Sequence, residues 1–173
     1  MLITGCGIIC AIGQDRKQVL ESLLATRTGV GPLRYLKTGH TEFPVGEVKM
    51  SDAEMESSMG IAPGTPTTRT ALMGMMAMRE ALDQAGLTAA DLPRTGFVDG
   101  TTVGGMDKSE RYYLDFIGND SRNEYIGTHD CGSCSEMIAD TVMAASSTLR
   151  NLCSMTRVAE VRLSDMRSSS MDS

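Results

Sequence analysis

The chain has 173 residues, with 16 Lys and Arg against 22 Asp and Glu, and a formal net charge of −6 at pH 7. Its length suits one domain, and 41% hydrophobic residues suffice for a core, which excludes a disordered protein. The acidic balance, without a Lys/Arg cluster, argues against a nucleic-acid or anionic-membrane binder. No apolar run approaches the roughly 20 residues that span a bilayer, and the sequence shows no secretory leader pattern, so we expect a cytoplasmic protein.

The distribution of glycine divides the chain in two. All 18 glycines and all 5 prolines lie at or before Gly132, whereas residues 141–173 contain neither. That last stretch is rich in Ser, Arg and Met, and its final residues lack apolar periodicity. We therefore predict a folded unit over residues 1–140, followed by a partly disordered tail over residues 141–173 that does not continue its pattern.

In chain order, residues 1–4 are mostly apolar and end at a Gly-Cys-Gly turn, which predicts a buried first strand. An amphipathic helix is predicted over residues 16–26, with Asp15 as its N-cap. The polar, proline-containing stretch 33–66 follows. Within it, residues 41–49 are predicted to hold one or two short strands.

The clearest element is a helix that Thr67 or Thr68 caps and that runs to about Ala85, where Gly86 supplies a left-handed stop. Its apolar stripe indicates a main element of the core rather than a binding surface. The stripe consists of Ala71, Leu72, Met75, Met76, Ala81, Leu82 and Ala85.

Beyond this helix, residues 95–98 predict a buried strand, and the glycine-rich stretch 100–106 predicts a tight turn at its end. A glycine-rich stretch of this kind indicates close backbone approach: a turn, a ligand or a neighbouring subunit. Asp107 is expected to cap the next helical segment, which reaches Tyr113 or Phe116.

The last predicted elements are a polar loop over residues 118–127 and a helix capped by Ser133 or Ser135 that extends to about Leu149. The complete order, β, α, β, α, β, α, α, favours an α/β layered domain over a sandwich or a helical bundle.

Two glycine motifs do not indicate a nucleotide cofactor. The Gly-x-Gly at residues 5–7 lacks the third glycine of a dinucleotide fingerprint, because Cys10 stands at that position. The stretch 100–105 lacks the Gly-Lys-Ser/Thr of a phosphate-binding loop. We therefore expect no cofactor.

The cysteines favour free thiols over disulfides. Cys131 and Cys134 form the one Cys-x-x-Cys motif, and a zinc site would have to draw further ligands from Cys153, His129 and His40. Small buried thiols are the leading interpretation, and we expect no metal. A redox pair with a lowered thiol pKa, or a metal module, remains a weaker alternative.

Three segments, taken together in their order and spacing, resemble the N-terminal region of the β-ketoacyl-acyl-carrier-protein synthases, which are elongating condensing enzymes. The first contains Ile-Thr-Gly-Cys-Gly, and the last reads Gly-Thr-Thr-Val-Gly-Gly-Met. The resemblance covers roughly residues 1–140. Its segments are residues 2–13, then 69–77 with 80–82 and 85–87, then 100–106.

The resemblance implies a thiolase-like layered fold made of two similar βαβαβ-type halves, of which this chain would hold the N-terminal half, incomplete. It implies a 3-oxoacyl-carrier-protein synthase, which joins an acyl thioester to malonyl-carrier protein by decarboxylative Claisen condensation in fatty-acid or polyketide synthesis. The implied partners are acyl-carrier protein, malonyl-carrier protein and a second subunit in a dimer. A cysteine thiolate at a helix N-terminus accepts the acyl group, and two histidines of the second half assist.

The resemblance also suggests site residues. Cys153-Ser154 partially matches the family's Thr-Ala-Cys-Ser-Ser-like nucleophile motif, so Cys153 is the candidate catalytic residue. Val103 corresponds to a position that lines the acyl pocket near the dimer interface, and Gly104 and Gly105 complete the turn.

The paired histidines would come from sequence that this chain does not contain, so we expect a fragment that is inactive alone. The alternative is a non-catalytic interaction module that pairs with a full-length synthase as a homo- or heterodimer. Half of a layered fold would also leave apolar faces uncovered, which predicts poor solubility or oligomers.

Overall fold

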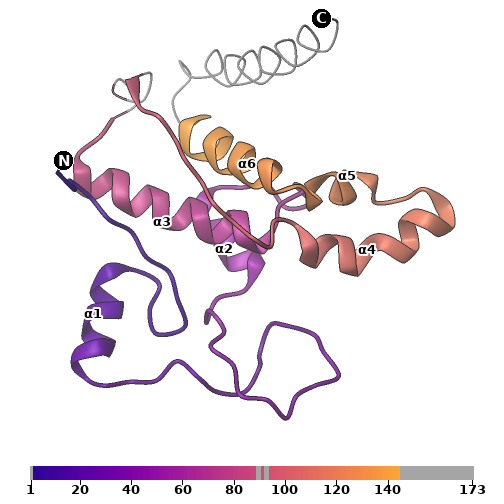
Figure 1. The fold of residues 1–173 in the computed structure, drawn as a ribbon, viewed down its shortest axis with the longest axis horizontal. Helices are drawn as coiled ribbons and strands as arrows, with labels where there is room; N and C mark the ends of the chain where they lie inside the picture. The colour runs from indigo at the N-terminus through magenta and orange to yellow at the C-terminus, as the bar shows by residue number, and fades with distance from the viewer. Residues whose placement is uncertain (1, 89–90, 92–93, 145–173) are drawn as a thin grey trace, which may run out of the picture.

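The computed structural model describes residues 2–88, 91 and 94–144, and within them the regular elements are helical. Helices α3 and α6 lie side by side, and α2 packs against α3 (Figure 1). Helices α4 and α5 form an arm on one side, and α1 lies apart from them. The helices are α1 (Arg16–Leu24), α2 (Asp52–Met59), α3 (Arg69–Ala85), α4 (Met106–Asn119), α5 (Asn123–Ile126), the 3-10 turn η2 (Gly127–His129) and α6 (Cys131–Ala144).

Helix α3 confirms the strongest prediction. The hydroxyl oxygen of Thr68 accepts a hydrogen bond from the backbone N–H of Ala71 at 3.2 Å, which caps the helix N-terminus. Gly86 ends the helix in the left-handed conformation, with a φ of 65°. Helix α1 likewise begins after Asp15, whose carboxylate accepts from the backbone N–H of Gln18 at 2.8 Å.

The core lies where α2, α3 and α6 meet. Gly74 of α3 faces Ile138 of α6, and a Cβ added at Gly74 would lie 2.5 Å from Cδ1 of Ile138. The absent side chain therefore lets the two helices approach closely. The buried cluster at this junction contains Met55, Ala71, Leu72, Met75, Cys134 and Ile138.

Helix α2 was not predicted, although the sequence carries its signal. Ser51 and Glu54 form a capping box: the Ser51 hydroxyl accepts from the backbone N–H of Glu54 at 3.2 Å, and Glu54 accepts from the backbone N–H of Ser51 at 2.7 Å. A Ser followed three residues later by Glu is the usual signature of such a helix start. Helix α5 also interrupts the predicted loop 118–127.

Two predicted N-caps are wrong. Helix α4 begins at Met106 after Gly105, so Asp107 lies inside its first turn. Helix α6 begins at Cys131, because the carbonyl of Asp130 already accepts from the backbone N–H of Ser133 at 3.2 Å. Ser135 donates its hydroxyl to Asp99 instead of capping the helix.

The two predicted buried strands are not formed in the described residues. Leu2, Ile3 and Val98 are 90%, 84% and 93% exposed, so burial was wrongly predicted for them. The β-pairing found in the described part of the chain consists of two isolated bridges, Cys10 to Gly13 and Gly31 to Val45. A strand forms only when a neighbouring strand pairs with it, and no such pairing reaches these two segments in the described residues.

Helix α3 takes the place of a strand neighbour for the N-terminal segment. The backbone N–H groups of Cys6 and Ile8 donate to the side chains of Gln84 at 2.8 Å and Glu80 at 3.0 Å. Gly7 lies against the α3 backbone, where an added Cβ would come within 1.9 Å of the Ala77 carbonyl oxygen. The glycine turn thus serves close packing on a helix.

The predicted tail boundary at residue 141 falls inside α6, which continues to Ala144. Residues 145–173, the disorder predicted for them and the candidate nucleophile Cys153 lie outside the described residues. Among the described helices, none combines the length and apolar character needed to cross a membrane.

Candidate functional site

The glycine turn that precedes α4 holds the three predicted pocket residues. The hydroxyl oxygen of Thr101 accepts from the backbone N–H groups of Val103 at 3.2 Å and Gly104 at 3.3 Å. Gly104 adopts a φ of 54°, in the left-handed region that favours glycine. The turn is therefore fixed by one threonine and by the absence of a side chain at its tightest point.

The turn packs against η2. A Cβ added at Gly105 would lie 2.0 Å from the carbonyl oxygen of Thr128, and one added at Gly104 would lie 2.7 Å from that of His129. The predicted close backbone approach is confirmed, but its partner is η2 of the same chain, which was not predicted. Val103 is 49% exposed at the surface, and its role in lining an acyl pocket stays a prediction.

A charged cluster joins three helices next to this turn. Asp52 of α2 lies between Arg69 of α3, with Nη1 to Oδ1 at 2.7 Å, and Lys108 of α4, with Nζ to Oδ2 at 3.3 Å. Lys108 is buried and also lies 3.6 Å from the carboxylate of Asp107. The pairing compensates the cost of placing the Lys108 ammonium in the interior. The sequence carries no local signal for this cluster.

Arg69 extends the cluster to the loop before α2. Its Nη2 donates to the carbonyl oxygens of Val48 and Met50, each at 3.0 Å. Its guanidinium also lies over the ring of Tyr35, 5.8 Å from the centroid. Arg69 therefore holds together the loop, α2 and α3.

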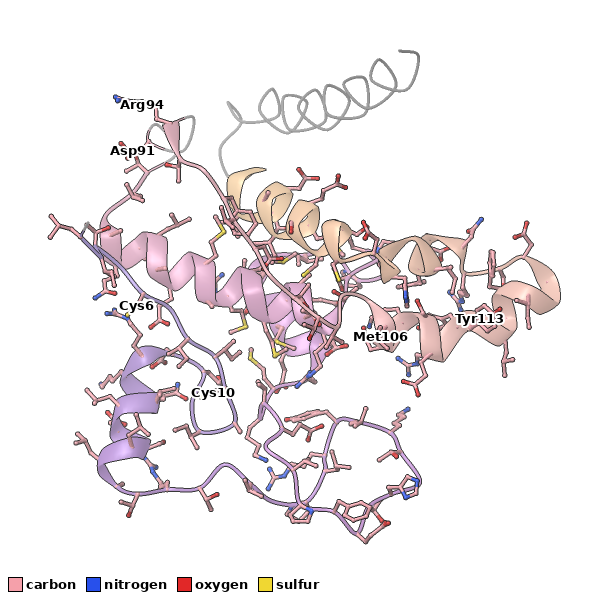
Figure 2. All side chains as sticks on the ribbon, viewed as in Figure 1. Cys6, Cys10, Asp91, Arg94, Met106 and Tyr113 are labelled. Carbon is pink, nitrogen blue, oxygen red and sulfur yellow. The ribbon has the colours of Figure 1, made fainter. Side chains whose placement is uncertain are left out.

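The Cys-x-x-Cys motif lies at the start of α6, with Cys131 exposed and Cys134 buried. Burial, followed by the nearby carboxylate of Asp99, raises the pKa of the Cys134 thiol to about 11. The lowered thiol pKa expected of a redox pair is thus wrong for Cys134. Cys6, Cys10, Cys131 and Cys134 are all free thiols, as predicted, and Figure 2 shows Cys6 and Cys10 along the N-terminal segment.

The two histidines are engaged with oxygen atoms. Nδ1 of His129 lies 2.9 Å from the hydroxyl oxygen of Ser109, and Nδ1 of His40 lies 3.3 Å from the carboxylate of Glu42. Across the described residues, no three His, Cys, Asp or Glu side chains gather into a possible metal site.

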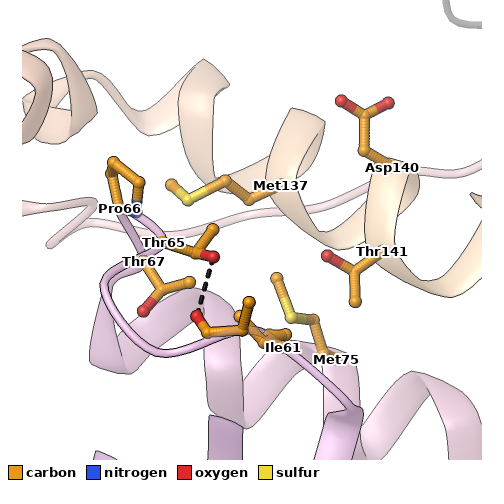
Figure 3. A pocket seen from close by; sticks show the side chains of 9 residues that line it. Ile61, Thr65, Pro66, Thr67, Met75, Met137, Asp140 and Thr141 are labelled. Carbon is orange, nitrogen blue, oxygen red and sulfur yellow. Dashed lines mark hydrogen bonds between the residues drawn. The ribbon is translucent and has the colours of Figure 1, made fainter.

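A concavity of about 360 Å³ lies between residues 61–67, α3 and α6 (Figure 3). Its walls combine apolar side chains with hydroxyl groups and one carboxylate. The residues that line it are Ile61, Ala62, Thr65, Pro66, Thr67, Met75, Met137, Asp140 and Thr141. A second concavity, of about 370 Å³, lies where residues 14–15 face α2 and α3.

The sequence of this chain matches a known protein family. Residues 1–146 match the family model of the β-ketoacyl synthase N-terminal domain, so the chain belongs to the β-ketoacyl synthase family. The match confirms the resemblance and extends it by six residues, to the end of α6 and just past it. This family domain is a thiolase-like α/β unit, whose strands are not formed in the described residues.

Two relatives place the chain within the family. It is similar to 3-oxoacyl-[acyl-carrier-protein] synthase 1 of Haemophilus influenzae, with 32% identity over 111 residues. It is also similar to nodulation protein E of Rhizobium meliloti strain 1021, with 28% identity over 117 residues. These alignments cover 60% and 65% of this chain but 25% and 28% of the relatives. The alignments thus span about a quarter of either relative's length.

Proposed function

We propose that this chain forms the N-terminal domain of a cytoplasmic 3-oxoacyl-carrier-protein synthase. The reaction is the decarboxylative Claisen condensation of an acyl thioester with malonyl-carrier protein, in fatty-acid or polyketide synthesis. The family match over residues 1–146 carries this proposal. In it, the turn formed by Val103, Gly104 and Gly105 borders the acyl pocket near a dimer interface, and Cys153 is the nucleophile.

The 173-residue polypeptide by itself is inactive in this proposal. Acyl transfer requires a thiolate, and the buried Cys134 does not fit that role because its pKa is raised to about 11, so the proposed nucleophile stays Cys153. Condensation further requires two histidines that face the reacting thioester, whereas His129 contacts Ser109 and His40 contacts Glu42. The missing groups come from a second half.

A condensation assay with the purified polypeptide tests its inactivity. Acyl-carrier protein and malonyl-carrier protein are incubated with the wild type and with Cys153→Ala, and the 3-oxoacyl product is measured. We expect equal background signals. Product from the wild type above the Cys153→Ala level would show an active chain.

A chimera tests the family role itself. Residues 1–146 replace the matching region of the Haemophilus influenzae relative, which then supplies its own remaining sequence. A soluble chimera that forms 3-oxoacyl product supports the proposal. A soluble, cooperatively folded chimera without product argues against it.

The alternative function is a non-catalytic module that pairs with a full-length synthase. Exposed apolar side chains favour it: Leu24 of α1 is 78% exposed, and Leu114 and Ile117 of α4 are 76% and 59% exposed. Size-exclusion chromatography with and without a full-length synthase separates the alternatives. Co-elution as a homo- or heterodimer supports the module, and a stable monomer that ignores the synthase contradicts it.

A further inference from the structure

The long loop between α1 and α2 is closed at its base by two kinds of contact. Gly31 and Val45 exchange both backbone hydrogen bonds, at 3.1 and 2.9 Å. Beside this bridge, the carboxylate of Glu47 accepts from three successive backbone N–H groups: Arg34 at 2.8 Å, Tyr35 at 3.1 Å and Leu36 at 2.7 Å. Successive amides that converge in this way form a nest for an anion, and the chain's own carboxylate occupies it.

The rest of the loop makes mainly local contacts. His40 donates its backbone N–H to the Thr38 hydroxyl and pairs through its ring with Glu42, and Phe43 is 59% exposed. The segment from residue 31 to residue 47 is therefore tied down near its ends, while its tip is free of long contacts. Glu47 supplies most of the hydrogen bonds that close it.

Arg69 is the charged group of the neighbouring helices that acts on Glu47. Its guanidinium is covered by the Tyr35 ring, which belongs to the same segment that Glu47 holds, and it is paired with Asp52 of α2. Desolvation raises the pKa of the Glu47 carboxyl. The hydrogen bonds from the three backbone N–H groups and the charge of Arg69 outweigh it, and the pKa falls below its ordinary value of 4.5.

We propose that residues 31–47 form a strap over Arg69 whose release point is the Glu47 carboxylate. Protonation or neutralisation of Glu47 frees the strap, and Tyr35 then leaves the guanidinium of Arg69. Both oxygens of the Glu47 carboxylate accept hydrogen bonds, whereas a neutral carboxyl or an amide keeps one accepting oxygen and presents a donor in place of the other, so part of the hydrogen bonding to the nest is lost. This device is separate from the condensation reaction and does not depend on it.

The direction of the pH dependence follows from the lowered pKa. The hydrogen bonds of the carboxylate contribute fully above the unfolded value of 4.5 and are lost as the pH falls through the folded value. The strap is thus closed at neutral pH and released in acid. His40 and Glu42 lie at the tip of the segment and pair with each other rather than with Glu47.

Hydrogen–deuterium exchange of the whole chain tests the proposal with a matched pair of variants. Glu47→Gln keeps the shape of the side chain but removes its charge, and Glu42→Gln does the same at the exposed tip. We expect Glu47→Gln to lower protection of the amides in residues 31–47 by at least about tenfold, with α3 and α6 unchanged. This factor corresponds to the loss of one hydrogen bond to a charged group. Glu42→Gln should match the wild type.

Two further readouts complete the test. Phenylglyoxal should modify Arg69 faster in Glu47→Gln than in the wild type. In acid, the amides of residues 31–47 should be no better protected in the wild type than in Glu47→Gln, while α3 peptides stay protected. The proposal is overturned by unchanged protection in Glu47→Gln, by a loss that spreads through α3 and α6, by unchanged Arg69 modification, or by a loop advantage that persists in acid.

Discussion

The carboxylate of Glu80 accepts a hydrogen bond from the backbone N–H of Ile8, 72 residues earlier in the chain, at 3.0 Å. Its other oxygen accepts from the backbone N–H of Arg16 at 2.9 Å and from Nε of the same residue at 3.1 Å. One side chain of α3 thus fixes both the N-terminal segment and the start of α1. Glu80 is therefore a main anchor of the N-terminal segment on α3.

Replacing Glu80 should therefore destabilise the protein. Glu80→Ala leaves the donors of Ile8 and Arg16 without their acceptor, and we expect a loss of about 1–3 kcal/mol in the free energy of unfolding. Urea denaturation followed by circular dichroism measures it. Glu21→Ala, at an exposed position of α1, is the control and should change the free energy by less than about 0.5 kcal/mol. Equal effects of the two substitutions would argue against the anchor.

Stability should fall in acid. Desolvation raises the pKa of Glu80, but hydrogen bonds from Arg16 and Ile8 and the charge of Arg16 outweigh it, so the pKa lies below its ordinary value. The associated stability is present above the unfolded pKa and is lost as the pH falls through the folded one. Unfolding free energies measured between about pH 6 and about pH 3 should decrease, and less steeply in Glu80→Ala. Parallel slopes would contradict this assignment.

Replacing Gly105 and Gly118 by Ala should change the stability of the protein in opposite directions. Gly105→Ala places a Cβ 2.0 Å from the Thr128 carbonyl oxygen, so α4 and η2 must separate, and we expect a loss of about 1–3 kcal/mol. Gly118→Ala meets open space inside α4 and should gain up to about 1 kcal/mol through helix propensity. Thermal unfolding of both variants gives the signs. A neutral Gly105→Ala would show that the close approach is not needed.

Thiol labelling should follow burial. Cys6 and Cys131 are exposed and should react readily with a maleimide at neutral pH, whereas Cys134 is buried and protonated and should react only on unfolding. Peptide mass mapping after brief labelling reports each site. Asp99→Asn removes a charge that raises the pKa of Cys134, but burial is the larger cause, so labelling of the folded protein there should stay slow. Rapid labelling of Cys134 in the wild type would overturn its assignment as a structural thiol.

The uncovered apolar side chains should make the chain self-associate. Leu24 projects from α1, and Leu114 and Ile117 project from α4 into solvent. We expect oligomers in size-exclusion chromatography with light scattering, and a shift towards monomer in Leu24→Glu with Leu114→Glu. Lys17→Glu is a control that makes α1 more negative without removing apolar surface. A wild type that melts sharply as a monomer contradicts this expectation.

The sequence predicts an element of this fold when the residues that determine it are neighbours in the chain. Helix α3 was predictable because its cap at Thr68, its apolar stripe and its stop at Gly86 all lie within a single segment. Helix α2 was equally accessible through Ser51 and Glu54. The strands were not, since burial of Leu2 and Ile3 requires partners elsewhere in space, and local pattern cannot say whether those partners are present.

In the candidate site, too, the locally determined turn was predictable and the long-range charged cluster was not. The close approach at Gly104 and Gly105 was predictable because only glycine fits such a turn, although the sequence did not identify η2 as its partner. The pair between Asp52 and Lys108 joins residues 56 positions apart, and each looks like an ordinary surface charge in its own segment. Such pairs become visible only once the helices are placed.

The reach of Glu80 back to Ile8 also bears on synthesis at the ribosome. The N-terminal segment emerges first, but the helix that receives it is not complete until Ala85 has been added. During that interval a β-prone stretch that includes Leu2, Ile3 and Ile8 has no native neighbour, and contacts so distant along the chain form slowly. During synthesis, residues 2–8 therefore wait for their native contact until α3 has been added to the chain.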